Sequence, residues 1–116
     1  MRSNEILERS YQFALRIIRL VSSLPKNEIC KVIGGQLLRS GTSVGANVEE
    51  AQAGYSKSDF ANKMSIAQKE ARESNYWLRL LMDTKQIRED LLKEIIDESE
   101  EISKILFSIV KTSKPR

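Results

Sequence analysis

Four arginines near the start of the chain are spaced to contact an anionic partner together. On a helix at about 100° per residue they share one arc roughly 100° wide, opposite the apolar face: Arg2, Arg9, Arg16 and Arg19. Guanidinium groups bind phosphate oxygens, so this arc predicts a nucleic-acid-binding surface, with RNA as the expected ligand. Glu5 lies on the same arc and Glu8 at its edge. The alternative interpretation is therefore an ordinary solvated helix face, in which Glu5 and Arg9 form an i, i+4 pair.

A second set of polar residues is spaced to lie near helix interfaces in the middle of the chain. It consists of Arg39, Asn47 and Glu50 in one segment and of Glu70 and Glu73 in the next. Arginine can form a forked pair with a carboxylate, and asparagine can bond to a neighbouring backbone. We expect a structural network centred on Arg39, with Glu70 or Glu73 as its partner, that fixes the register of the helices.

Two acidic pairs raise an enzymatic alternative. Glu70 and Glu73, with Glu94 and Asp97, resemble the Glu-x-x-Glu…Glu-x-x-Asp pattern of all-α nucleoside triphosphate pyrophosphohydrolases. The resemblance implies carboxylates that hold magnesium and activate a water for attack on phosphate. However, Glu94 and Asp97 belong to an acidic run typical of a solvated face. We therefore expect no enzyme: no catalytic residue, no metal and no cofactor.

Composition excludes several further classes of chemistry. The 116 residues contain no histidine, which removes Ser-His-Asp triads, Cys-His pairs and histidine-bearing zinc sites. Cys30 is the only cysteine, so the chain cannot form an internal disulfide. The apolar runs are far shorter than the roughly 20 residues that span a bilayer, and no apolar leader segment begins the chain. We expect one domain, residues 1–116, that is soluble, cytoplasmic and without membrane contact.

Apolar residues repeat with the helical period almost throughout, which predicts an all-α fold. The first helix begins after Ser3 or Asn4 and stops before Pro25. Asn27 caps the start of the second, which continues to Ala53 with Gly54 as its C-terminal cap. Ser56 or Ser58 opens the third, with a seam of Phe60, Met64, Ala67, Ala71, Ser74, Leu78 and Leu81. A turn over 83–87 leads to the fourth. Four long helices with short connections favour an antiparallel up-down-up-down bundle.

The first and fourth predicted helices carry more apolar surface than a bundle core requires. A bundle helix needs an apolar arc of only about 100° or slightly more, whereas these cover about half the circumference. The excess predicts a second buried contact, and so a homo-oligomer.

All five glycines fall in one 21-residue window: Gly34, Gly35, Gly41, Gly45 and Gly54. Glycine costs about 1 kcal/mol against alanine inside a helix, and is tolerated where a neighbouring backbone comes close. A phosphate-cradling loop is the alternative, but the Gly-x-x-x-x-Gly-Lys-Ser/Thr pattern and the preceding strand are missing. The window therefore predicts a tightly packed middle of the second helix.

Two motifs carry a resemblance to a known family. They are Arg39-Ser40-x-x-Ser43-Val44-x-x-Asn47-Val48-x-Glu50 and Lys69-Glu70-Ala71-x-Glu73-Ser74-x-Tyr76-Trp77-Leu78. The chain resembles the bacterial four-helix-bundle family also called 23S rRNA intervening-sequence proteins. The resemblance implies a four-helix protomer in a homopentameric ring. A related branch, the accessory variability determinants of diversity-generating retroelements, has a similar fold and binds nucleic acid together with a reverse transcriptase.

Two functions follow as hypotheses. Residues 1–48 hold seven basic and three acidic residues, whereas residues 49–116 hold twelve and thirteen, so the net charge of +3 belongs to the first two helices. A ring of five copies would repeat the arginine arc around its circumference and bind RNA. The alternative is an assembly module whose ring binds a protein partner through its apolar faces.

Overall fold

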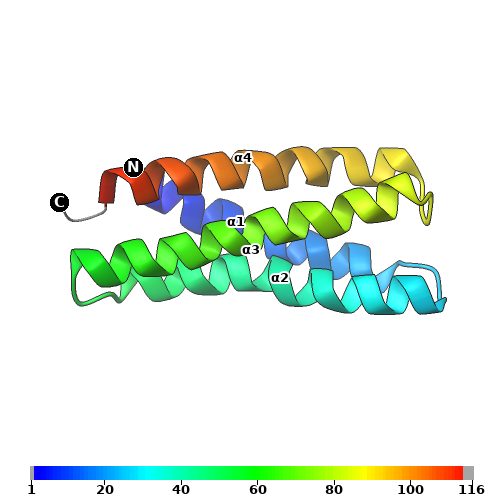
Figure 1. Cartoon of the computed structure of the whole chain (residues 1–116), viewed down its shortest axis with the longest axis horizontal. Coiled ribbons are helices and arrows are strands. Elements are labelled where there is room, and N and C mark those ends of the chain that lie inside the picture. The colour runs from blue at the N-terminus through cyan, green and yellow to red at the C-terminus, as the bar shows by residue number, and fades with distance from the viewer. Residues whose placement is uncertain (1, 114–116) are drawn as a thin grey trace.

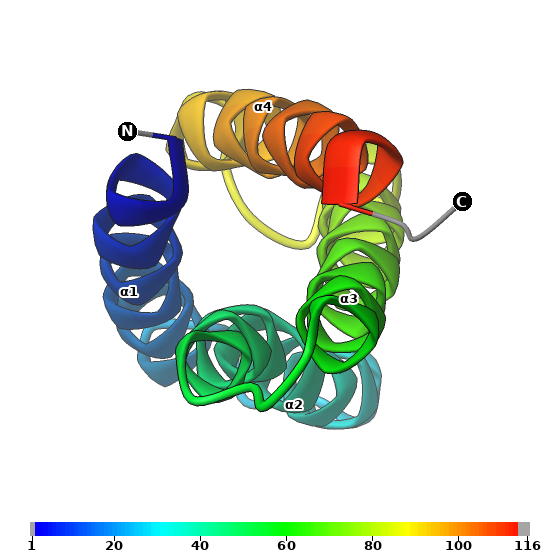
Figure 2. The same cartoon turned by 90° about the vertical axis from the view of Figure 1, so that its left-hand side faces the viewer.

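The computed structural model describes residues 2–113 and consists of four helices joined by short turns. They are α1 (Arg2–Ser22), α2 (Glu28–Gln52), α3 (Lys57–Asp83) and α4 (Glu89–Ser113). Consecutive helices run in opposite directions along a rod of 47 × 21 × 19 Å (Figure 1). Seen end-on, they follow one another around the rod axis, so α4 returns beside α1 (Figure 2). The predicted all-α up-down bundle is confirmed.

The core lies along the bundle axis and is built from apolar side chains spaced three and four residues apart on each helix. The largest fully buried ones are Phe13, Ile6, Ile17, Leu37, Met64, Leu78, Leu81, Leu92, Ile102, Leu106, Val44 and Val48. The predicted seam of α3 is buried from Met64 to Leu81, with Phe60 partly buried at its start. Helical periodicity therefore located the core correctly, because the 3.6-residue repeat places these side chains on one face.

Capping residues set where two of the helices begin. The Asn27 side chain accepts a hydrogen bond from the Cys30 backbone N–H at 2.8 Å, and Ser56 accepts one from that of Asp59 at 3.0 Å. Both are caps that the sequence predicted, with Ser56 rather than Ser58 at α3. The prediction for α1 was wrong: this helix begins at Arg2, so Ser3 and Asn4 lie within it.

The end of α2 differs from the prediction that Gly54 caps it. The cap is Ala53, at φ −92°, and no glycine of the described residues has a positive φ. Gly54 lies instead where two backbones approach, since a Cβ there would come within 3.1 Å of the Ala51 carbonyl oxygen. The residue that does adopt the left-handed conformation is Lys85, at φ 56°, after the end of α3.

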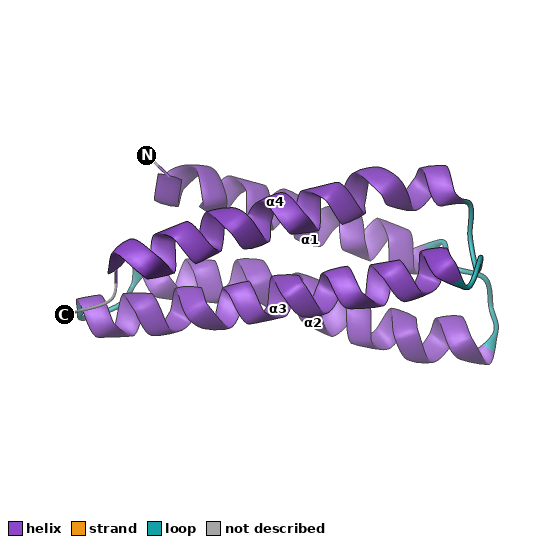
Figure 3. Ribbon diagram, turned by 45° about the horizontal axis from the view of Figure 1, so that its top comes forward, coloured by secondary structure: helices purple, strands orange, loops and turns teal. Residues whose placement is uncertain are grey.

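Four of the five glycines, all but Gly54, lie within the continuous helix α2, which excludes a phosphate loop there (Figure 3). A Cβ on Gly41 would lie 2.8 Å from both γ carbons of Ile17, and one on Gly45 would lie 3.2 Å from the Ser10 carbonyl oxygen. These two glycines let α1 approach α2 more closely than any side chain would allow. The cost in helix propensity is offset by the packing.

Each helix also contributes one fully buried serine, and these are Ser10, Ser40, Ser74 and Ser99. The hydroxyls of Ser40 and Ser74 lie 2.8 Å apart and join α2 to α3. A buried hydroxyl is tolerated when it is hydrogen-bonded, and no side-chain polar atom buried in residues 5–113 lacks a partner. Small residues thus shape two of the helix contacts from inside, glycines between α1 and α2 and serines between α2 and α3.

None of the four helices has, in its described residues, a stretch long and apolar enough to cross a membrane.

Candidate functional site

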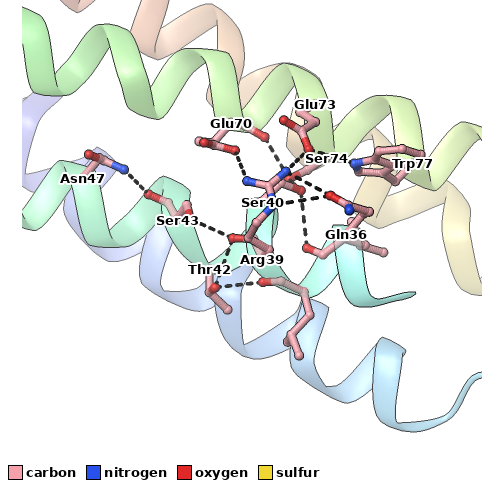
Figure 4. A network of polar contacts seen from close by, with 12 residues as sticks. Gln36, Arg39, Ser40, Thr42, Ser43, Asn47, Glu70, Glu73, Ser74 and Trp77 are labelled. Carbon is pink, nitrogen blue, oxygen red and sulfur yellow. Dashed lines mark hydrogen bonds and ion pairs between the residues drawn. The ribbon is translucent and has the colours of Figure 1, made fainter. Parts of the chain in front are cut away.

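Arg39 of α2 reaches across to two carboxylates of α3. Its Nη1 lies 3.1 Å from Glu70 Oε1, its Nη2 contacts Glu73 Oε2, and its Nε donates to Gln36 at 3.3 Å (Figure 4). Glu73 Oε2 also accepts a hydrogen bond from Trp77 Nε1 at 3.0 Å. The sequence predicted Glu70 or Glu73 as the partner of Arg39, and the structure brings both to it. We call Arg39, Glu70 and Glu73 the arginine clamp.

The other two residues predicted for this network do not contact the arginine clamp directly. Asn47 donates to the backbone oxygen of Ser43 at 2.9 Å, which lies on its own helix rather than a neighbouring one. The exposed Glu50 side chain forms no hydrogen bond or ion pair with the described part of the chain. Asn47 thus bonds to a backbone, as expected, and is linked to Arg39 through Ser43, whose hydroxyl donates to the Arg39 carbonyl oxygen at 2.7 Å. The prediction was wrong for Glu50, whose exposed side chain has no contact with the network.

The clamp also bears on the magnesium alternative. Both carboxylates of the first acidic pair are engaged by Arg39, and Glu94 and Asp97 are exposed on α4. No group of three or more aspartate, glutamate, cysteine or histidine residues in the described chain is arranged to hold a metal ion. A site for hydrated magnesium needs converging oxygen ligands that carry negative charge, which these pairs do not provide here.

The four predicted arginines of α1 do not form one free surface. Arg9 donates from Nε and Nη2 to the two carboxylate oxygens of Glu98 on α4, at 3.0 and 2.6 Å, and lies 3.6 Å from Glu5. The hydrogen bond to the Glu98 carboxylate raises the pKa of Arg9 above its ordinary value. Its side of α1 therefore faces α4, not the solvent opposite the core. The side chain of Arg2 lies outside the described residues.

Arg16 and Arg19 remain without a carboxylate partner in the described residues. They border a small hollow of about 290 Å³ between α1 and α4, lined also by Leu20, Ser23, Leu91 and Ile95. Two free guanidinium groups beside apolar side chains can hold an anionic group that also carries apolar surface. The predicted arc is thus reduced to a two-arginine site.

Sequence reasoning missed a larger cationic feature. A groove of about 660 Å³ runs between α3 and α4, and four of its lining residues are basic: Lys69, Arg72, Arg79 and Lys104. Residues 49–116 carry a net charge of −1, which concealed these basic residues. Only two acidic residues, Glu73 and Glu100, line the groove beside them. The spacing of Lys69, Arg72 and Arg79, in steps of three and seven, was the available signal.

These features define the class of protein: it is an up-down four-helix bundle with an arginine clamp between two of its helices. The family model for the 23S rRNA-intervening sequence protein matches residues 2–108, and the chain belongs to this family. No curated protein matches the chain.

A solved structure is closely similar. It is described as a protein with unknown function from the S23 ribosomal protein family of Bacteroides thetaiotaomicron, 44% identical, with a TM-score of 0.89. The match covers 96% of this chain and 99% of the other. The fold is therefore shared over essentially the full length of both.

Proposed function

We propose that this protein is a non-enzymatic, homo-oligomeric scaffold, a ring of five copies, that binds RNA. The observation that carries the assembly is an exposed apolar stripe on α1. Tyr11 and Ile18, seven residues apart, are 52% and 43% exposed, and Leu38 on the adjacent helix is 38% exposed. Large apolar side chains gathered on one face favour a protein contact over water. The apolar surface of α1 that the core does not bury would thus form the contact between subunits.

Light scattering of the purified protein at micromolar concentration tests the assembly. We expect a mass five times the 13.3 kDa of one chain. Ile18→Lys places a charge in the stripe and should yield monomers, whereas Asn62→Lys adds the same charge at an exposed polar position of α3 and should leave the mass unchanged. A monomeric wild-type protein would refute the assembly.

RNA binding is supported by the uncompensated basic side chains. Arg16 and Arg19 have no acidic partner in the described residues, and symmetric assembly would repeat them around the ring. Guanidinium groups contact phosphate oxygens irrespective of base sequence, so this binding is expected to depend strongly on salt.

A polarisation assay with structured RNA tests this function. We expect binding at about 50 mM salt that weakens steeply as salt rises, because bound phosphates release counterions. No binding at that salt would contradict the proposal. The alternative, a protein partner held on the apolar stripe, is separated by a pull-down with and without nuclease, since only a protein contact survives nuclease treatment.

A further inference from the structure

The groove between α3 and α4 is elongated. A second hollow, lined by Gln68, Arg72, Ser103, Lys104 and Phe107, shares three residues with the first and continues it. On α3 the lining extends from Gln68 to Arg79, which at 1.5 Å per residue corresponds to about 16 Å. A groove of this length is longer than a single phosphate ion needs and suits a chain of linked anionic groups.

The basic residues of the groove are available to a ligand. Lys69 and Arg72 make no ion pair or side-chain hydrogen bond in the described chain, and Lys104 lies a loose 3.7 Å from Glu101. Of the two acidic lining residues, Glu73 is already held by Arg39, which leaves Glu100 as the uncompensated one. The positive charge here therefore exceeds the free negative charge.

A relay of hydrogen bonds holds Arg79 in position. Arg79 Nε donates to Asn75 Oδ1 at 2.8 Å, Asn75 Nδ2 donates to Ser99 Oγ at 2.9 Å, and Ser99 Oγ donates to the Ile96 carbonyl at 2.6 Å. This relay leaves the terminal nitrogens of Arg79 without a partner in the described residues. A guanidinium fixed through Nε presents its remaining N–H groups in a geometry suited to phosphate oxygens. The Ser103 hydroxyl, also without a described partner, adds a neutral donor.

One exposed aromatic ring lines the groove, and a second lies beside its Arg79. Phe107 is 56% exposed in its continuation, and Tyr76 is 47% exposed with the Arg79 guanidinium carbon 5.9 Å from its ring centroid. Basic grooves edged by aromatic rings are the usual arrangement for single-stranded nucleic acid, because bases stack on the rings while cations follow the backbone. Free phosphate would not use the rings.

We infer that the groove between α3 and α4 is a binding site for the phosphodiester backbone of single-stranded RNA, with Arg72, Arg79 and Lys104 as the phosphate contacts. This inference rests on the proposed RNA-binding function. It places the main RNA contact in the groove between α3 and α4 instead of at Arg16 and Arg19 of α1.

Polarisation of a labelled ten-nucleotide oligouridine tests the site. Arg72→Gln with Lys104→Gln should weaken binding at least tenfold at 50 mM salt. It should also reduce the slope of log affinity against log salt by about 1.4, at roughly 0.7 for each lost phosphate contact. The matched control, Lys26→Gln with Lys31→Gln, removes the same charge outside the groove and should bind as the wild type does. Equal loss in both variants would overturn the site, since only net charge would then matter.

Two further arms separate this site from the proposed function. If Arg16→Gln with Arg19→Gln abolishes binding while the groove variant binds normally, the groove is refuted and RNA binding stands. If the wild type binds no RNA, NMR with inorganic tripolyphosphate decides. Changes in the chemical shifts of the Ser99 and Ser103 backbone amides would support an anion-binding groove without the RNA function. No change at these amides would overturn the groove as well as the RNA function.

Discussion

The guanidinium of Arg9 donates two hydrogen bonds to the carboxylate of Glu98, at 3.0 and 2.6 Å, and so joins the first helix to the last. The contact between α1 and α4 is the least extensive in the bundle. A forked, charge-assisted pair is stronger than a single neutral hydrogen bond, and its planar geometry fixes how the two helices align. This pair therefore closes the bundle at its weakest seam.

We predict that Arg9 and Glu98 are energetically coupled by about 1 kcal/mol, at the upper end of the range for partly exposed pairs. A double-mutant cycle of Arg9→Gln and Glu98→Gln in urea unfolding measures this coupling. Because the pKa of Arg9 is raised in the folded state, its contribution to stability is fully present below the pKa of the unfolded chain and is lost only as the pH rises through the raised pKa. The exposed pair Arg88 and Asp90 serves as control and should couple by less than about 0.3 kcal/mol.

The arginine clamp gives a second prediction. Arg39→Met should lower the free energy of unfolding by about 1 kcal/mol, because Glu70, whose side chain is only 14% exposed, would then lie beside Glu73 without a cation. Adding Glu70→Gln to that variant should restore part of the loss, since it removes one of the two like charges. Thermal melts and light scattering of both variants provide the measurement. An unchanged melting temperature and oligomeric state in Arg39→Met would show that the clamp has no structural role.

The bundle could be predicted from sequence because it depends on local spacing. The clamp could be predicted because Arg39 and its two carboxylates lie on consecutive helices, which a short turn forces to pack side by side. The three- and four-residue steps of α3 place its seam inward whatever the neighbouring helix is. The direction in which Arg9 points could not be predicted in this way. The sequence does not say which helix lies beside this face of α1, because that depends on the order of the helices around the axis. Its partner Glu98 also lies 89 residues away in the chain.

The α3–α4 groove shows the same limit. Arg72 and Lys104 belong to different helices, and each has acidic neighbours in the sequence that cancel its charge in any count along the chain. Tyr76 has no second aromatic residue one turn away on its own helix, so the sequence of α3 alone shows no stacking surface. Phe107 lines the continuation of the groove from α4, and it meets Arg72 of α3 there only because the two helices pack together.

Two glycines of α2 give opposite predictions for one substitution. Gly35→Ala should raise the free energy of unfolding by about 0.5 to 1 kcal/mol, because no atom lies within 4 Å of the added Cβ and alanine favours the helix. Gly41→Ala should instead lower it by about 1 to 2 kcal/mol, since the Cβ would lie 2.8 Å from both γ carbons of the buried Ile17. Urea unfolding of the two variants beside the wild type measures the contrast. Equal shifts in the same direction would mean that helix propensity alone governs both positions.

The turn after α3 offers a stabilising change. Lys85 N–H bonds to the Met82 carbonyl at 3.0 Å and Gln86 N–H to the Leu81 carbonyl at 3.1 Å, the pairing of a Schellman motif, with Lys85 in the left-handed position that glycine usually fills. Lys85→Gly should raise the free energy of unfolding by about 0.5 to 1 kcal/mol, the relief of strain exceeding the added entropy of the unfolded chain. Lys85→Ala keeps the Cβ and should give no such gain. Denaturation midpoints of both variants decide, and a gain shared by the alanine variant would assign the effect to the lysine side chain rather than to the backbone.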